Sequence, residues 1–220
     1  MQAAISADIV SSTSLAKEDT IRLKSRIEEL FELLGTKYPG FWGRLIKGDY
    51  MECIVPRACD ALRIALIIKT YIKSFEPSPS ERSTKDFQTY GLRMAVGIGG
   101  MRTSDPKEGI MDGEAIYLSG RAVGDMEQLF KGTMRIRVNN EKLAPALNTI
   151  AILTDALLNS ATQRQSQVLY YKLMGYKETD IAGMMNIKQS SVNRHSSQSK
   201  WYSIEETLDY FEHINFDDYE

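Results

Sequence analysis

The sequence contains few residues that bind metal ions through sulfur or imidazole. Its 220 residues include two cysteines, Cys53 and Cys59, and two histidines, His195 and His213. Neither cysteine lies in a CxxC pattern or beside a histidine, and neither histidine has ligand partners near it in the sequence. This spacing argues against a zinc site and against a disulfide framework. We expect two reduced thiols in the core of a cytoplasmic protein.

Long hydrophobic runs and a strong excess of one charge are also absent. No run approaches the roughly 20 apolar residues of a membrane span, and no basic segment precedes the short apolar start, so we expect no signal peptide. The fractions of hydrophobic (43%) and charged (25%) residues are typical of a soluble globular protein. A net charge of −2 provides no overall attraction to nucleic acid or acidic lipid. We therefore predict a soluble protein of one large or two small domains, with no membrane partner.

The charge is nevertheless uneven near the C-terminus. Residues 162–202 contain six basic and two acidic side chains, whereas the segment after Tyr202 contains seven acidic and no basic ones. This asymmetry suggests an anionic partner for the first of the two segments.

The opening segment, residues 3–15 (AAISADIVSSTSL), places one carboxylate in an apolar strand. An unpaired carboxylate in a core costs several kcal/mol, so Asp8 is expected at a strand end, bound to a cation or paired. Residues 9–13 can direct backbone N–H groups and a helix N-terminus at the same point, as phosphate sites do. The alternative is that Asp8 caps a helix that begins near Ser14.

The remaining pattern predicts an α+β domain over residues 1–142. Helices are expected at 18–34, 57–75 and 115–130, a hairpin at 41–56 that turns at Lys47-Gly48-Asp49, and strands at 92–99 and 134–138. Residues 76–87 and 102–114 read as a loop and a polar excursion. The order β-α-β-β-α-β-α-β favours a ferredoxin-like antiparallel sheet with helices on one face.

Asp49, at the hairpin tip, becomes informative when it is combined with Asp8. A Gly-Asp turn is common and needs no function. In a β-α-β-β unit, however, the first strand lies beside the third, so its end and the hairpin tip approach each other. Two carboxylates there can hold Mg²⁺ or Mn²⁺ against a triphosphate.

Three segments together resemble the catalytic domain of class III nucleotide cyclases. Residues 7–15 (ADIVSSTSL) are similar to F-x-D-I-x-G-F-T-x-L, residues 47–55 (KGDYMECIV) to the GD hairpin, and residues 92–99 (LRMAVGIG) to the next strand. The resemblance implies that Asp8 and Asp49 bind Mg²⁺ or Mn²⁺, with the Ile9 carbonyl as a further ligand. We expect a nucleotide to contact Val10, Ser11, Ser12, Thr13 and Lys47.

The sequence departs from the cyclase pattern where catalysis takes place. Cyclases have G-x-x-V-N-x-A-x-R, whereas residues 119–129 read SGRAVGDMEQL, with Gly124 at the Asn position and Gln128 at the Arg position. Glycine cannot orient a ribose, and an amide cannot offset phosphate charge as a guanidinium does. Arg121 is expected to take over part of this role in binding a nucleotide. We predict nucleotide binding without efficient cyclase turnover.

The whole chain also resembles the SatD family of small bacterial proteins. This resemblance is carried by the GIG strand at 97–99, by DGEAIYLSGR at 112–121 and by a C-terminal helix-turn-helix. It implies an architecture, a cyclase-like domain followed by DNA-binding helices, more than an activity.

Residues 147–220 are predicted to form a small all-α domain. Helices are expected at 162–174, 177–185 and 188–199, followed by an acidic helix at 204–214. The first three resemble sigma-factor region four and LuxR-type readers. Side chains of the third helix are then expected to contact bases or phosphates, namely Lys188, Gln189, Ser190, Ser191, Asn193, Arg194 and Lys200. A three-helix module that binds protein is the alternative.

Three functions follow. The preferred one is a cytoplasmic, homodimeric DNA-binding regulator that binds a nucleotide with Mg²⁺ or Mn²⁺. The second is an active cyclase or related phosphoryl-transfer enzyme. The third is a domain without a ligand that serves to dimerise the DNA-binding helices.

Overall fold

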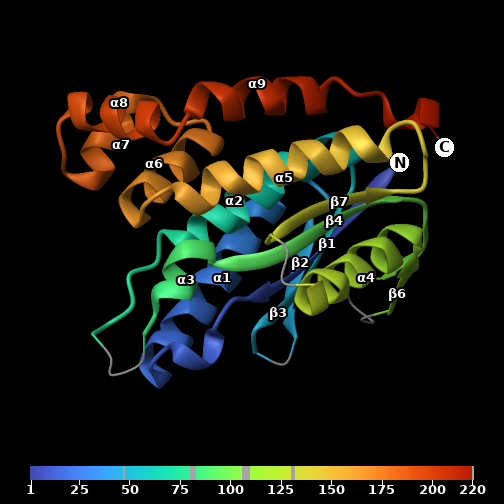
Figure 1. The fold of residues 1–220 in the computed structure, drawn as a ribbon, viewed down its shortest axis with the longest axis horizontal. Helices are drawn as coiled ribbons and strands as arrows, with labels where there is room; N and C mark the ends of the chain where they lie inside the picture. The colour runs from blue at the N-terminus through green and yellow to red at the C-terminus, as the bar shows by residue number, and fades with distance from the viewer. Residues whose placement is uncertain (47, 80–82, 106–109, 130–131, 220) are drawn as a thin grey trace.

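The computed structural model describes residues 1–46, 48–79, 83–105, 110–129 and 132–219, and contains a five-stranded sheet in the order β2-β3-β1-β4-β7 (Figure 1). The first four strands in this order form three antiparallel pairs, in the order of a ferredoxin-like unit, which confirms the predicted α+β fold. β7 pairs parallel with β4, because a helix crosses over between these two strands. The strands are β1 (Gln2–Ile9), β2 (Trp42–Ile46), β3 (Tyr50–Val55), β4 (Leu92–Gly99) and β7 (Met134–Val138).

Helices cover both faces of the sheet, whereas the sequence analysis placed them on one. α1 (Lys17–Lys37) and α2 (Ala61–Lys73) pack on the face to which Ala3 and Ile5 of β1 point. α4 (Glu114–Leu129) packs on the opposite face, where Ala4 contacts Ala115. The reason lies in β1, which is apolar on both sides and is therefore buried on both.

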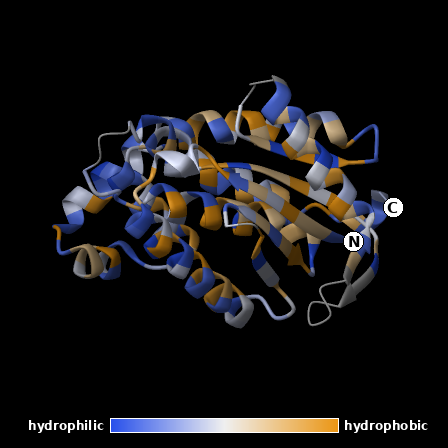
Figure 2. Cartoon of the chain, turned by 90° about the horizontal axis from the view of Figure 1, so that it is seen from below, coloured by the Kyte–Doolittle hydropathy of each residue, from blue (hydrophilic) through white to orange (hydrophobic). Residues whose placement is uncertain are grey.

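α2 is buried on nearly all sides. Besides Leu62 and Ala65, the side chains of Ile64, Leu66 and Ile67 are fully buried. One side of α2 faces the sheet and the other faces the C-terminal helices α6 and α9. A helix that is hydrophobic all round belongs in such a position. Figure 2 shows hydrophobic residues along the strands of the sheet.

Three elements lie in segments that were predicted to be irregular. α3 (Lys85–Tyr90) begins within the predicted loop 76–87 and is anchored by the buried side chain of Phe87. β5 (Met101–Asp105) and β6 (Ile110–Gly113) form a separate two-stranded sheet in the predicted polar excursion. Short 3-10 helices occur at η1 (Ser12–Ser14), η2 (Ala58–Asp60) and η3 (Phe216–Tyr219).

The C-terminal region consists of five helices, close to the predicted bounds where these were given. They are α5 (Ala144–Ser160), α6 (Gln163–Leu173), α7 (Glu178–Met185), α8 (Gln189–Gln198) and α9 (Trp201–Glu212). α6 starts with a capping box, in which Thr162 and Gln165 satisfy each other's backbone N–H groups. α7 ends at Asn186, whose left-handed backbone begins the turn into α8.

Helices α6, α7 and α8 share a small core of their own, and we refer to them as the three-helix unit. Val168, Ile181, Met185 and Val192 form this core. Leu169 and Tyr170 on the other side of α6, and Ile204 and Phe211 of α9, join the main core of the sheet instead. The boundary between residues 142 and 147 stays a prediction. Figure 1 shows α7 and α8 at one end of the molecule and α9 running back along the top.

No helix among the described residues has both the length and the hydropathy to cross a membrane.

The tight contact between β4 and α4 gives a stability test. A Cβ added at Gly97 would lie 2.1 Å from the Ala115 carbonyl oxygen, so backbone would have to move. We expect Gly97→Ala to lower the free energy of unfolding by about 2–3 kcal/mol. A Cβ at Gly124, also on α4, meets no atom within 4 Å, so Gly124→Ala should raise it by up to about 1 kcal/mol. Urea denaturation measures both, and equal effects would contradict the packing described.

Candidate functional site

Asp8 lies near the end of β1, between two neighbouring strands. Its cross-strand partners are Tyr50 of β3 and Arg93 of β4. The Asp8 Oδ2 atom is 3.5 Å from an Arg93 guanidinium nitrogen, and Glu127 of α4 is 4.0 Å from the same nitrogen. The alternative that Asp8 caps a helix is wrong, because α1 starts at Lys17 after Ala16 and has no side-chain cap.

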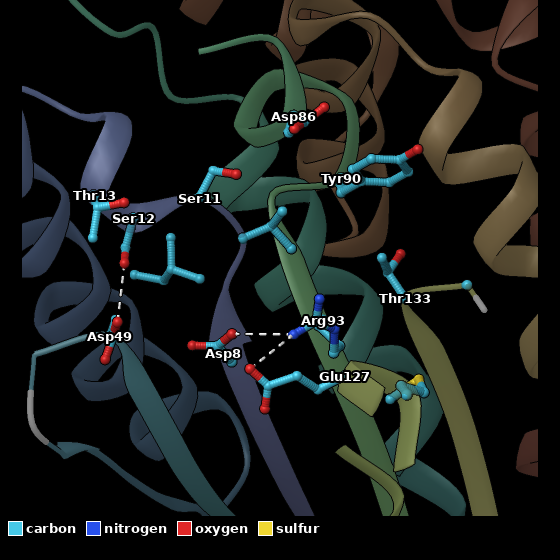
Figure 3. A pocket seen from close by; sticks show the side chains of 14 residues that line it. Asp8, Ser11, Ser12, Thr13, Asp49, Asp86, Tyr90, Arg93, Glu127 and Thr133 are labelled. Carbon is cyan, nitrogen blue, oxygen red and sulfur yellow. Dashed lines mark hydrogen bonds and ion pairs between the residues drawn. The ribbon is translucent and has the colours of Figure 1, made fainter. Parts of the chain in front are cut away.

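The structure brings Asp49 into the same pocket as Asp8. Asp49 immediately precedes β3, and its carbonyl oxygen accepts a hydrogen bond from the Ile9 N–H at 3.1 Å. Its carboxylate accepts a second one from the Ser12 hydroxyl at 2.9 Å. Figure 3 shows one carboxylate oxygen of Asp8 directed at Arg93 and the other directed to the side of Asp49.

Burial and neighbouring charges raise the pKa of Asp8 to about 6. Partial removal from water is the largest cause, the negative charge of Asp49 is the second, and Glu127 adds to it, while Arg93 acts in the opposite direction. Ionised Asp8 is thus destabilised by its surroundings despite its ion pair. A cation between Asp8 and Asp49 would relieve the repulsion between them.

The pocket has a volume of about 670 Å³ and an acidic wall. Among the described lining residues there are four carboxylates and one guanidinium, from Asp8, Asp49, Asp86, Glu127 and Arg93. A polyphosphate alone would be repelled by such a wall, whereas a polyphosphate that carries a divalent cation would not. The remaining lining residues are Ile9, Val10, Ser11, Ser12, Thr13, Tyr90, Met126, Gly132 and Thr133.

The predicted phosphate cradle is only partly present. Ser11, Ser12 and Thr13 line the pocket, but the N–H of Val10 is bonded to the Gly91 carbonyl at 3.0 Å and that of Ile9 to Asp49. A single 3-10 turn follows β1, and α1 begins at Lys17, beyond the residues of this segment that line the pocket. The N–H groups of Ile9 and Val10 are therefore not available to a phosphate.

Arg121, one of the predicted nucleotide residues, does not line this pocket. Arg121 lines a different depression, together with Arg102, Tyr117 and Asn139. It is six residues before Glu127 on α4, about 9 Å along the helix axis. Lys47 falls outside the described residues.

The donors present fit a divalent cation that arrives with a phosphate. Among the described residues no three His, Cys, Asp or Glu side chains gather as a metal site. Mg²⁺ commonly uses one or two carboxylates, with substrate phosphates and water completing its shell. Asp8 and Asp49 would supply those carboxylates, and Ile9 is placed beside them in the pocket.

Sequence analysis missed Arg93, Asp86, Tyr90, Glu127 and Thr133 as pocket residues. Arg93 carried a usable signal, since it is a charged residue in an otherwise apolar strand. Its partner could be assigned only from the register between β1 and β4. The other four come from α3, α4 and the segment before β7, which meet only in the folded chain.

The predicted DNA residues occupy one exposed surface of α8 and its flanks. Lys188, Gln189, Ser190, Asn193, Arg194 and Lys200 are exposed, and Ser191 is half-buried. Val192 and Ser196 point inward, so the helix is fixed on α6 and α7 by one side only. Burial and the nearby charges of Arg194 and Arg164 lower the pKa of His195. Arg164 of α6 therefore lies near this surface, and sequence analysis did not assign it a contact.

Comparisons with known proteins concern the fold. No family model matches the sequence, and no curated protein matches it. A bacterial light-regulated adenylyl cyclase is similar over 61% of this chain and 74% of its own, with 16% identity and a TM-score of 0.37. A second such structure covers 61% and 42%, with 14% identity and a TM-score of 0.36. A guanylyl cyclase covers 55% and 67%, with 14% identity and a TM-score of 0.32. The fold assignment rests on the strand order of this chain.

The raised pKa of Asp8 predicts that Asp8→Asn stabilises the protein above pH 6. Between the ordinary pKa of 3.8 and about 6 the folded protein holds the Asp8 proton more tightly than the unfolded chain, so stability falls as pH rises through this window. Asparagine carries no charge and avoids this loss. Because the site is partly solvated, we expect a gain of about 1 kcal/mol at pH 7.5. Urea denaturation of both proteins should show the gain vanish at pH 4; a gain independent of pH would contradict the assignment.

Proposed function

We propose that this chain is a DNA-binding regulator whose α+β part binds a nucleotide together with Mg²⁺ or Mn²⁺. The observation that supports DNA binding best is the outer surface of α8. It presents Gln189, Ser190, Asn193, Arg194 and Ser197, all exposed, and no large apolar side chain. No carboxylate occurs between Asp180 and Glu205, although the chain contains 29 acidic residues. A solvated helix usually mixes both charges, whereas a helix that enters the major groove avoids acidic ones.

The turn between α7 and α8 is also suited to this role. Three residues, 186–188, connect the two helices, and the left-handed Asn186 begins the connection. Short turns of this kind set the second helix of a helix-turn-helix across the first. Amide and hydroxyl groups of α8 would then contact base edges, while Lys188, Arg194 and Lys200 would contact phosphates.

DNA binding is tested with a random-sequence duplex by fluorescence anisotropy at several salt concentrations. We expect the affinity to fall steeply with salt, because bound phosphates release counterions. Lys188→Ala and Arg194→Ala should each weaken binding about 3- to 10-fold and reduce the salt slope by about 1. Lys142→Ala removes the same charge from an exposed site before α5 and serves as the control. Equal losses in all three variants, or no binding by the wild type, would contradict the proposal.

The acidic pocket supports the ligand half of the proposal. Asp8 and Asp49 can share a divalent cation whose remaining positions are filled by phosphate oxygens and water. The hydroxyl groups of Ser11, Ser12 and Thr13 line the same pocket, and the ring of Tyr90 offers a surface for a base. We expect the cation to be required for nucleotide binding, because the pocket walls are negative.

Thermal unfolding measures this requirement. ATP or GTP with Mn²⁺ should raise the melting temperature of the wild type, and the same nucleotide with EDTA should not. Asp49→Asn should abolish the shift. Asp112→Asn, on β6, removes a carboxylate outside the pocket and should keep it. A shift without metal, or one that survives Asp49→Asn, would contradict the proposed site.

The same incubations address the enzymatic alternative, which the pairing of Asp8 with Asp49 favours. Gly124 and Gln128 stand where a cyclase has Asn and Arg, and Arg93 is engaged by Asp8 and Glu127. Removing a group that stabilises transition-state charge costs about 10²–10³ in rate. We therefore expect binding without cyclic product. Cyclic nucleotide detected by chromatography would favour an active cyclase over a domain that only binds the nucleotide.

Two wider features belong to the proposal. Each chain carries one three-helix unit, so a homodimer would present two of them to a two-fold symmetric site in the cytoplasm. Membership of the SatD family is proposed on the motifs at 97–99 and 112–121 and on the C-terminal helices.

A further inference from the structure

Lys69 of α2 is fully buried, and its amine has three acceptors. It donates to the carbonyl oxygens of Tyr90 at 3.0 Å and Leu92 at 2.7 Å, and to the Thr133 hydroxyl at 3.0 Å. The carbonyl oxygens can only accept, and the hydroxyl proton is directed to Asp155. Three N–H groups are therefore needed, and only the protonated amine has three. Burial lowers the pKa of Lys69, whereas the negative charge of Asp155 raises it and the three acceptors favour the ammonium form.

Asp155 of α5 completes the arrangement as the counterion. It is 3% exposed, and its Oδ1 lies 3.4 Å from the Lys69 nitrogen. It accepts hydrogen bonds from both the N–H and the hydroxyl of Thr133, each at 2.6 Å. Asn159, one turn later on α5, also donates to the Thr133 hydroxyl at 3.0 Å. Lys69, Thr133 and Asp155 thus form a saturated network, which we call the buried hub.

The buried hub holds one wall of the acidic pocket. Thr133 and Tyr90 both line that pocket, and Leu92 is next to Arg93, the partner of Asp8. Lys73, one turn after Lys69, donates to the carbonyl oxygens of Gln88 and Thr89. Two lysines of α2 therefore bind the last carbonyl groups of α3, which carries Asp86 and Tyr90 (Figure 3).

The other side of the buried hub leads to the three-helix unit. α5, which carries Asp155 and Asn159, ends at Ser160, and α6 starts three residues later. Gln163, the first residue of α6, donates to the Ser74 carbonyl just after α2 at 2.8 Å. α2, α5 and α6 are thus fixed to one another at the point where the pocket wall is anchored.

Stability alone does not account for such a group. Replacing a buried ion pair by apolar side chains of similar volume is often neutral or stabilising. A charged network with directed hydrogen bonds instead holds its residues in one arrangement. When one of these residues moves, the network changes to another discrete arrangement and does not deform gradually.

We propose that Lys69 and Asp155 are positioning residues of the acidic pocket, and that through Thr133 and α5 they link its occupancy to the affinity of the three-helix unit for DNA. This inference rests on the proposed function. A ligand that displaces Thr133 or α3 must either distort the buried hub or move α5 with it, and α5 leads directly into α6. By linkage, DNA binding would change ligand affinity by the same factor.

The test measures the dissociation constant of the full chain for a random-sequence duplex, with and without saturating ATP or GTP and Mn²⁺. For the wild type we expect the ligand to change it by a factor of about 5 or more. The double variant Lys69→Met/Asp155→Leu should bring this factor to about 1 while the duplex is still bound, because the packing is kept and the directed bonds are lost. Thr133→Val, which removes one hydroxyl group, should reduce the factor as well.

A matched control lies elsewhere on α2. Arg63 and Glu212 form an ion pair between α2 and α9 away from the pocket, with a nitrogen–oxygen distance of 3.1 Å. Arg63→Met/Glu212→Leu should keep the wild-type factor. Three results would overturn the inference. Thr133→Val and the double variant could keep the wild-type change in the dissociation constant for the duplex, the control variant could lose this change equally, or the ligand could leave the dissociation constant of the wild type unchanged. Wild-type thermal shifts and duplex binding are recorded separately, so loss of either identifies failure of the proposed function itself.

Discussion

The central position of β1 determines where the polar groups of the pocket meet. β1 is hydrogen-bonded to β3 on one side and to β4 on the other, both antiparallel. Antiparallel pairing on both sides sets the end of β1 beside the start of β3 and the start of β4. Asp8 is thereby aligned with Tyr50, next to Asp49, and with Arg93. A shift of one residue in either register would turn Asp8 into the apolar core beneath α1 and α2.

α2 has the corresponding role for the helical side of the molecule. It separates the sheet from α6 and α9, and nearly all of its side chains are buried. A helix in this position has no solvated face, so a charged residue on it must find partners inside the protein. Lys69 and Lys73 find them in α3, β4, Thr133 and α5. Burial and the neighbouring charge of Lys69 lower the pKa of Lys73 to about 7, which reflects how little water reaches this side of α2.

Sequence reasoning succeeded where a signal is local. β4 and β7 have the predicted bounds. β4 is a mostly apolar run that ends at glycine, and β7 alternates apolar and charged residues, and both patterns are typical of strands. The helix predicted at 162–174 also has nearly the bounds of α6, whose start is marked locally by the Thr162 cap. α3 was missed because serines and prolines precede it and Phe87 is its one buried residue. The periodicity of α2 likewise cannot show that a second face of this helix is covered. Asp8 and Asp49 stood out as carboxylates beside apolar strands, whereas Glu127 and Thr133 reach the pocket only through tertiary packing.

The attachment of the three-helix unit limits how it can move. It is connected to the body of the protein at both of its ends, through α5 into α6 and through α8 into α9. α9 is held on the main core by Ile204, Leu208 and Phe211, and α6 by Leu169 and Leu173. A module on one flexible linker could reorient in any direction. Because α6 is itself packed on the main core, α7 and α8 are the part of the unit that could change orientation. They are joined to the body at both ends, through α6 and α9, so such a change would be a hinge motion about the line between these two ends.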